Sequence, residues 1–97
     1  MPNPFGLLST DRSGTIATGG TSQQLAPVNA NRSYLFVQNL STGDLWINFT
    51  APATQGQGSI RIPANPASFV MESSYIIQEP VTIVGATTGQ AFTCKEA

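Results

Sequence analysis

Few residues of this chain carry side chains that do chemistry at neutral pH. None of its 97 residues is a histidine, and Cys94 is the only cysteine. Without histidine, neither Ser-His-Asp nor Cys-His catalysis is available, and the commonest metal ligand is missing. One cysteine cannot form a thiolate zinc site or a disulfide framework. Cys94 belongs to an alternating strand pattern, which favours a small core residue over a nucleophile.

The carboxylates are the remaining candidates for catalysis: Asp11, Asp44, Glu72, Glu79 and Glu96. Hydrolysis of a glycosidic bond needs two of them facing each other across about 5–10 Å. No motif brings Glu72 and Glu79 together, and Asp44 fits an ordinary position at the end of a turn. We therefore predict that the protein is not an enzyme and that it binds no cofactor and no metal.

Trp46 is the most informative single side chain for binding. By strand alternation it lies opposite the face formed by Leu45, Ile47 and Phe49. On an exposed face, Trp46 would stack on a sugar or anchor a protein interface. In the other interpretation the alternation is inverted, and Trp46 belongs to the core.

The composition points to a protein that packs against other molecules. Charged residues make up 9% of the chain, against about 25% in average globular proteins, and the net charge is -1. A nearly neutral polar surface lacks the repulsion that keeps proteins apart, although a soluble β domain of low charge has the same composition. The four basic residues are scattered, so we expect no nucleic-acid partner.

Neither a membrane span nor an export signal is visible in the sequence. The longest apolar run, Tyr34–Val37, is far shorter than the roughly 20 residues that a span requires. We therefore expect no membrane partner and synthesis in a reducing cytoplasm. Asn-x-Ser/Thr triplets at Asn31, Asn39 and Asn48 would be glycosylation sites only in a secreted protein, and we discard that interpretation.

Residues 1–30 differ from the rest of the chain, and we predict that they form an extended N-terminal arm. This segment is rich in Pro, Gly, Ser and Thr, with short strands possible near Thr15–Thr18 and Gln23–Val28. Phe5, Leu7 and Leu8 are large apolar side chains within four positions. On a solvated tail these side chains would stay exposed to water, so we predict that they dock on a neighbouring molecule.

Residues 31–97 are predicted to form the body, as a run of short strands and turns. The expected strands are Ser33–Leu40, Asp44–Phe49, Ser59–Ile62, Ser68–Met71, Tyr75–Gln78, Val81–Val84 and Ala91–Lys95. The first two, joined by the turn Ser41–Asp44, are predicted to pair as a hairpin. About eight short strands spaced in this way predict an all-β fold, an antiparallel β-sandwich or a jelly roll.

The body resembles short structural proteins of tailed bacteriophages over Asn31 to Glu96. The segments that carry the resemblance are Asn31–Asn39, Gly43–Phe49, Gly58–Ile62, Ser68–Glu72, Val81–Ala86 and Gln90–Lys95. It is a pattern of strands and turns without a catalytic signature. The chain departs from the pattern at Pro63–Ala67, where a tighter Pro-Gly-Gly turn is expected.

The resemblance implies a capsid decoration (cement) protein, located in the virion at the capsid surface after synthesis in the bacterial cytoplasm. Its partners would be the major capsid protein and copies of itself, as a homotrimer. Many weak contacts, repeated over every copy, would stabilise the shell. The candidate contact residues are Phe5, Leu7, Leu8 and Trp46. The alternative is a receptor- or glycan-binding knob of a phage head or tail fibre that uses Trp46.

Overall fold

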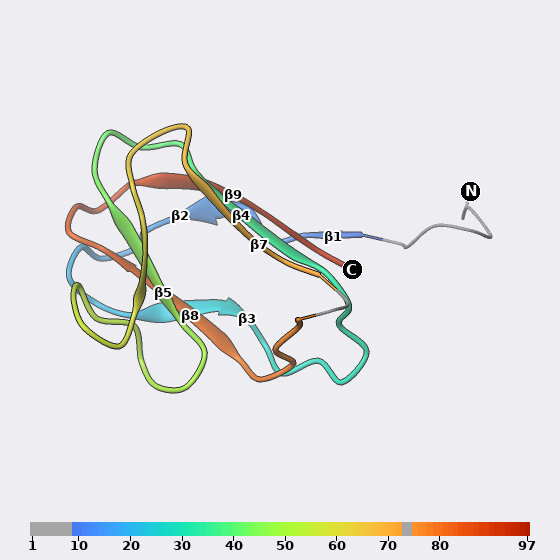
Figure 1. Cartoon of the computed structure of the whole chain (residues 1–97). Coiled ribbons are helices and arrows are strands. Elements are labelled where there is room, and N and C mark those ends of the chain that lie inside the picture. Colours follow the sequence, from blue (N-terminus) through green and yellow to red (C-terminus); the bar gives the residue numbers. More distant parts are fainter. Residues whose placement is uncertain (1–8, 73–74) are drawn as a thin grey trace.

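The computed structural model describes residues 9–72 and 75–97, which form two antiparallel sheets packed face to face (Figure 1). One sheet contains β1 (Thr10–Asp11), β2 (Gly14–Thr15), β9 (Ala91–Glu96), β4 (Leu35–Asn39) and β7 (Ser68–Met71). The other contains, in spatial order, β3 (Gln23–Ala26), β8 (Val81–Gly85), β5 (Leu45–Asn48) and β6 (Ile60–Ile62). This confirms the predicted β-sandwich. No helix in the described ranges is long and apolar enough to cross a membrane.

The order of pairing is that of a jelly roll. Strand β5 pairs with β6, β4 with β7, β3 with β8, and β2 with β9, all antiparallel. These nested pairs fall alternately in the four-stranded and the five-stranded sheet. The chain therefore behaves as one long hairpin, with its tip between β5 and β6, that is rolled into two layers.

Strands β1 and β2 act as one interrupted strand along β9. Thr10 lies opposite Glu96 and Gly14 opposite Phe92, so both strands keep the same register. In the interruption between them, the Ser13 hydroxyl accepts a hydrogen bond from the Cys94 backbone N–H at 2.9 Å. Counting β1 and β2 together, the described chain has eight strand positions, as the sequence predicts.

Alternation of side chains places the core between the two layers. The most buried positions recur at every second residue of the central strands, as in Leu35 and Val37 of β4 or Leu45 and Ile47 of β5, each 0% exposed. The remaining core residues are Ile16, Leu25, Ala26, Ile62, Met71, Val81, Ile83, Phe92 and Cys94. The apolar faces of both sheets thus cover each other, and this burial is the main stabilising term.

The predicted hairpin between Ser33–Leu40 and Asp44–Phe49 is wrong, because β4 and β5 belong to different sheets. The fully buried Asn39 side chain fixes the corner between them. Its Oδ1 accepts hydrogen bonds from the Ser41 backbone N–H and hydroxyl, at 2.8 and 2.7 Å. Its Nδ2 donates to the Gly43 and Ile62 carbonyls. The turn therefore carries the chain across to the other layer.

The predicted strand Tyr75–Gln78 is also wrong, since this segment forms only an isolated bridge between Glu72 and Tyr75. Backbone carbonyls of residues 77–79 accept hydrogen bonds from outside any sheet. Those of Ile77 and Glu79 accept hydrogen bonds from the Arg32 side chain, and that of Gln78 accepts one from the Asn29 backbone N–H.

The boundary expected at residue 30 does not separate an arm from the sandwich. Strands β1, β2 and β3 all precede residue 31 and pair with β9 or β8. Ile16, Leu25 and Ala26 from this part of the chain are buried in the core. The described part of the predicted arm, residues 9–30, is therefore a structural part of both sheets.

A buried ion cluster joins the end of β9 to residues that precede β2 and β4. Arg32, 1% exposed, donates from Nε to Glu96 Oε2 at 2.6 Å, and Arg12 donates from Nε to Glu96 Oε1 at 2.7 Å. The other Arg32 N–H groups reach the carbonyls of Pro27, Ile77 and Glu79. Burial alone would raise the pKa of Glu96, but hydrogen bonds from both arginines outweigh it and lower the pKa below the ordinary 4.5.

Substitution of Glu96 should therefore destabilise the fold strongly. Glu96→Gln leaves the Arg32 charge buried without its counter-charge, and we expect a loss of about 3 kcal/mol or more in the free energy of unfolding at pH 7. Asp44→Asn is the matched control, because it breaks the exposed Asp44–Arg61 pair and should cost less than about 1 kcal/mol. Urea unfolding of both variants measures the difference, and equal losses would contradict the assigned role of the cluster.

The ion pairing of Glu96 also predicts how the stability of the fold depends on pH. Because the pKa of Glu96 is lower in the folded state, its contribution is present above pH 4.5 and is lost as the pH falls through the folded value. The stability gap between wild type and Glu96→Gln should therefore shrink below pH 4.5. Thermal melts from pH 7 downward measure this gap, and a constant gap would contradict the ion pairing.

Candidate functional site

The sequence-predicted contact residues fall in two places. Phe5, Leu7 and Leu8 lie outside the described residues. Trp46 lies at the centre of β5 on the outer face of the four-stranded sheet, because its neighbours Leu45 and Ile47 point into the core. The interpretation in which Trp46 belongs to the core is therefore wrong.

Trp46 is half-buried on that outer face. It lies opposite Arg61 on β6 and opposite Val84 on β8, which is 2% exposed. The Arg61 guanidinium donates from Nε to Asp44 at 2.8 Å, so one side of the indole is bordered by an ion pair. Trp46 thus presents part of its ring next to a neutralised charge, an arrangement compatible with contact to a protein or a sugar.

Three of the five carboxylates form ion pairs with basic side chains of the same chain. Asp11, Asp44 and Glu96 are each held by a basic side chain, at 3.4, 2.8 and 2.6–2.7 Å. The Ser13 hydroxyl and backbone N–H, with Lys95, lower the pKa of Asp11 to about 2. Among the residues that the structure describes, no group of three His, Cys, Asp or Glu side chains is arranged to hold a metal ion.

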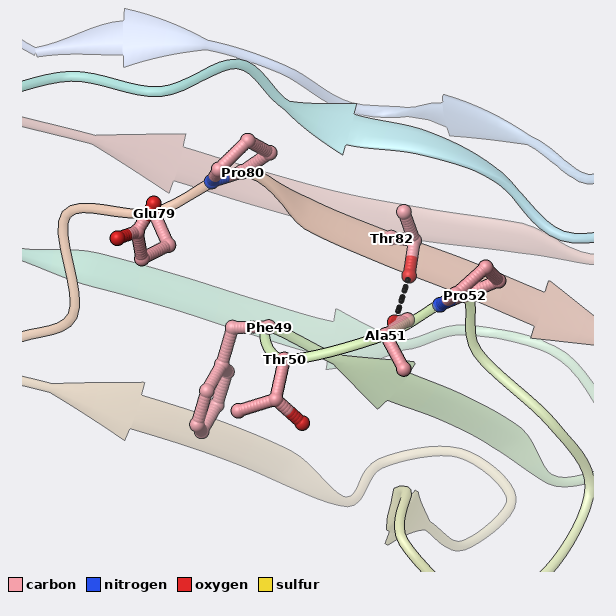
Figure 2. A pocket seen from close by; sticks show the side chains of 7 residues that line it. All are labelled: Phe49, Thr50, Ala51, Pro52, Glu79, Pro80 and Thr82. Atoms are coloured by element: carbon pink, nitrogen blue, oxygen red, sulfur yellow. Dashed lines mark hydrogen bonds between the residues drawn. The ribbon is translucent and has the colours of Figure 1, made fainter.

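A concave part of the described surface lies where β5 ends and β8 begins. Seven residues line a shallow hollow of about 510 Å³: Phe49, Thr50, Ala51, Pro52, Glu79, Pro80 and Thr82. We call it the Phe49–Glu79 hollow. Figure 2 shows its two walls, residues 49–52 after β5 and Glu79 and Pro80 before β8. Its walls are mostly apolar, and among its described lining residues only Glu79 carries a charge.

The wall formed by residues 49–52 is fixed by the side chain of Asn48, which is 6% exposed. Its Oδ1 accepts hydrogen bonds from the backbone N–H groups of Thr50 and Ala51, at 2.8 and 3.0 Å, and from the Thr50 hydroxyl at 3.0 Å. The Thr82 hydroxyl lies within hydrogen-bonding distance of the carbonyls of Asn48 and Ala51, at 3.2 and 3.3 Å. Figure 2 marks its hydrogen bond to Ala51. This wall is therefore held in place before any partner binds.

The opposite wall is fixed by the ion cluster. The Glu79 carbonyl accepts a hydrogen bond from Arg32 Nη1 at 3.0 Å, while the Glu79 side chain stays exposed to solvent. No sequence motif indicates this site. Its signals in the sequence are weak: one proline lies just beyond the end of β5 and another just before β8. Phe49 and Glu79 are thirty positions apart and come together only through the jelly-roll pairing of β5 with β8.

Cys94 is confirmed as a core residue, with an exposed fraction of 0%. Burial raises the pKa of its thiol to about 12, so the thiol stays protonated at neutral pH. A protonated and inaccessible thiol neither attacks a substrate nor exchanges with a disulfide.

Comparison with protein-family models and with curated proteins gives no match. Among solved structures, the chain is similar to a Bacillus protein described under "Bacillus endospore appendages form a novel family of disulfide-linked pili". The TM-score is 0.53 at 18% sequence identity, and the alignment covers 92% of this chain and 83% of that chain. A likeness at this identity shows the fold alone. Fold and site together define a β-sandwich domain with a small preformed surface hollow.

The position of Cys94 predicts its reactivity. We expect the native protein to react with Ellman's reagent far more slowly than the chain unfolded in guanidinium chloride, because the reagent needs an accessible thiolate. The rate of absorbance change at neutral pH measures both forms. Equal rates would contradict a buried thiol with a raised pKa.

Proposed function

We propose that this protein is a non-enzymatic structural protein that works by binding other proteins, as a decoration protein on a bacteriophage capsid. The observation that carries the proposal is the state of its charges. All four basic side chains are paired with carboxylates of the same chain. The resulting surface is polar and nearly uncharged, so copies and partners approach closely without electrostatic repulsion.

Two further observations support assembly as the function. The chain resembles phage structural proteins over Asn31–Glu96, as the sequence analysis describes. In addition, the described chain enters the fold at β1, on the edge of the five-stranded sheet, directly after Phe5, Leu7 and Leu8 in the sequence. In the sequence, a short apolar segment therefore precedes the strand at a sheet edge, and we expect this segment to dock on a capsid subunit or on a second copy.

The similarity to a pilus protein supports a second form of assembly. A protein of this fold in disulfide-linked pili makes a fibre of copies a specific alternative to a shell partner. The only cysteine of this sequence is buried, so a fibre of this chain would form without disulfides between folded subunits. Electron microscopy of the purified protein distinguishes the two forms, since fibres without capsids favour the pilus-like assembly.

Deletion of Met1–Ser9 tests the docking segment. We expect the truncated protein to keep the circular dichroism spectrum of the full chain, because the described core contacts begin after Ser9. We also expect it to lose stable attachment to capsids that lack the native protein. Co-sedimentation with such capsids measures attachment, and undiminished binding by the truncated chain would count decisively against this role.

Trp46→Ala separates decoration from the alternative of a receptor- or glycan-binding knob. Because Trp46 lies on the outer face beside Val84, we expect the variant to fold and to lose less than about 2 kcal/mol of stability. On the decoration proposal, a glycan array shows no binding for either protein. Strong glycan binding by wild type that disappears in the variant, with capsid attachment unchanged, would favour the knob instead.

A further inference from the structure

The ion pairs of this fold use every basic side chain that the sequence contains. Arg12 and Arg32 bind Glu96, Arg61 binds Asp44, and Lys95 binds Asp11, all within 3.4 Å. The sequence contains four Lys and Arg residues and no histidine. No basic side chain is therefore left over for a further carboxylate.

Two glutamates remain without a basic side chain as partner in the described structure, Glu72 and Glu79. Both side chains are exposed. Glu79 lines the Phe49–Glu79 hollow, where its neighbours include Phe49 and two prolines. A carboxylate beside an aromatic ring at a concave surface attracts a cation that also has apolar surface to bury.

Both walls of the hollow are held by buried polar side chains. Asn48 fixes Thr50 and Ala51 on one wall, and Arg32 fixes the Glu79 backbone on the other. A site whose walls are already ordered loses little conformational entropy when a partner binds. The hollow therefore keeps its shape before a partner binds, and Glu79 carries the charge among its described lining residues.

We propose that the Phe49–Glu79 hollow binds an arginine side chain of a different protein, with an apolar residue beside that arginine. The guanidinium pairs with the Glu79 carboxylate through two N–H groups and lies against the Phe49 ring, while the neighbouring apolar residue covers Pro52 or Pro80. A second copy of this chain would have to break an existing ion pair to supply the arginine. This inference rests on the proposed function, since it names the chemistry of the protein partner.

Peptide titration followed by NMR tests the inference on the full-length protein. The probe is acetyl-Leu-Arg-Leu-amide, and its control is the same peptide with citrulline, which keeps the shape and removes the charge. We expect the arginine peptide to shift the backbone amides of Thr50, Ala51 and Thr82 and to bind about threefold more tightly than the citrulline peptide.

The glutamate variants locate the charge. Glu79→Gln should remove the preference for arginine and its dependence on salt, whereas Glu72→Gln should keep both. Phe49→Leu, which keeps an apolar side chain against the core, should weaken binding of both peptides. The two-dimensional spectrum of each variant shows that it is folded.

Several outcomes would overturn the inference: equal binding of both peptides to wild type, an unchanged preference in Glu79→Gln, or shifts confined to another surface. Shifts of these amides by chitotriose and not by the arginine peptide would also overturn it and would indicate a sugar site.

Capsid co-sedimentation of Glu79→Gln separates the two proposals. If wild type and Glu79→Gln attach equally, the hollow is not the contact and decoration still holds; if wild type fails to attach, decoration itself fails.

Discussion

Arg32 places a positive charge in the protein interior, with a side chain that is 0% exposed, and such a charge is tolerated only when its N–H groups find acceptors. Glu96 neutralises the charge, and the carbonyls of Pro27, Ile77 and Glu79 accept the remaining hydrogen bonds. These groups come from β9, from the segment after β3 and from the connection that leads into β8. One side chain thus joins segments that strand pairing leaves apart.

Arg32 and its acceptors, which we call the clamp, hold parts of both sheets in place. Glu96 ends β9, which pairs with β1, β2 and β4, so the clamp fixes the central strand of the five-stranded sheet. Toward the other sheet, the clamp holds the segment without regular strand structure before β8, and with it one wall of the Phe49–Glu79 hollow. Buried amides do the same for the loops, because Asn39 and Asn48 each bond the second residue after them and end a strand in a defined corner.

Period-two patterns predict where strands occur but not which strands pair. The fold class, the burial of Cys94 and the outward side of β5 follow from local alternation, and Ser68–Met71 matches β7 at both ends. The partner of β4 depends on Asn39, whose role in a corner is not visible in an Asn-x-Ser triplet. In the sequence, Arg32 is only one of four scattered basic residues, because its acceptors lie up to 64 positions away. The hollow depends on the same long-range pairing, so the sequence indicates Trp46 and misses Phe49 and Glu79.

These contacts describe a domain that pairs each of its basic side chains with one of its own carboxylates and orders its loops from within. We propose that it acts as a component repeated over a shell, by contact alone. Quantitative mass spectrometry of purified phage particles tests this most directly, as the ratio of this chain to the major capsid protein. The expected result is a copy number of this chain of the same order as the copy number of the shell protein. Absence from the particles, or only a few copies at one vertex or in the tail, would contradict it.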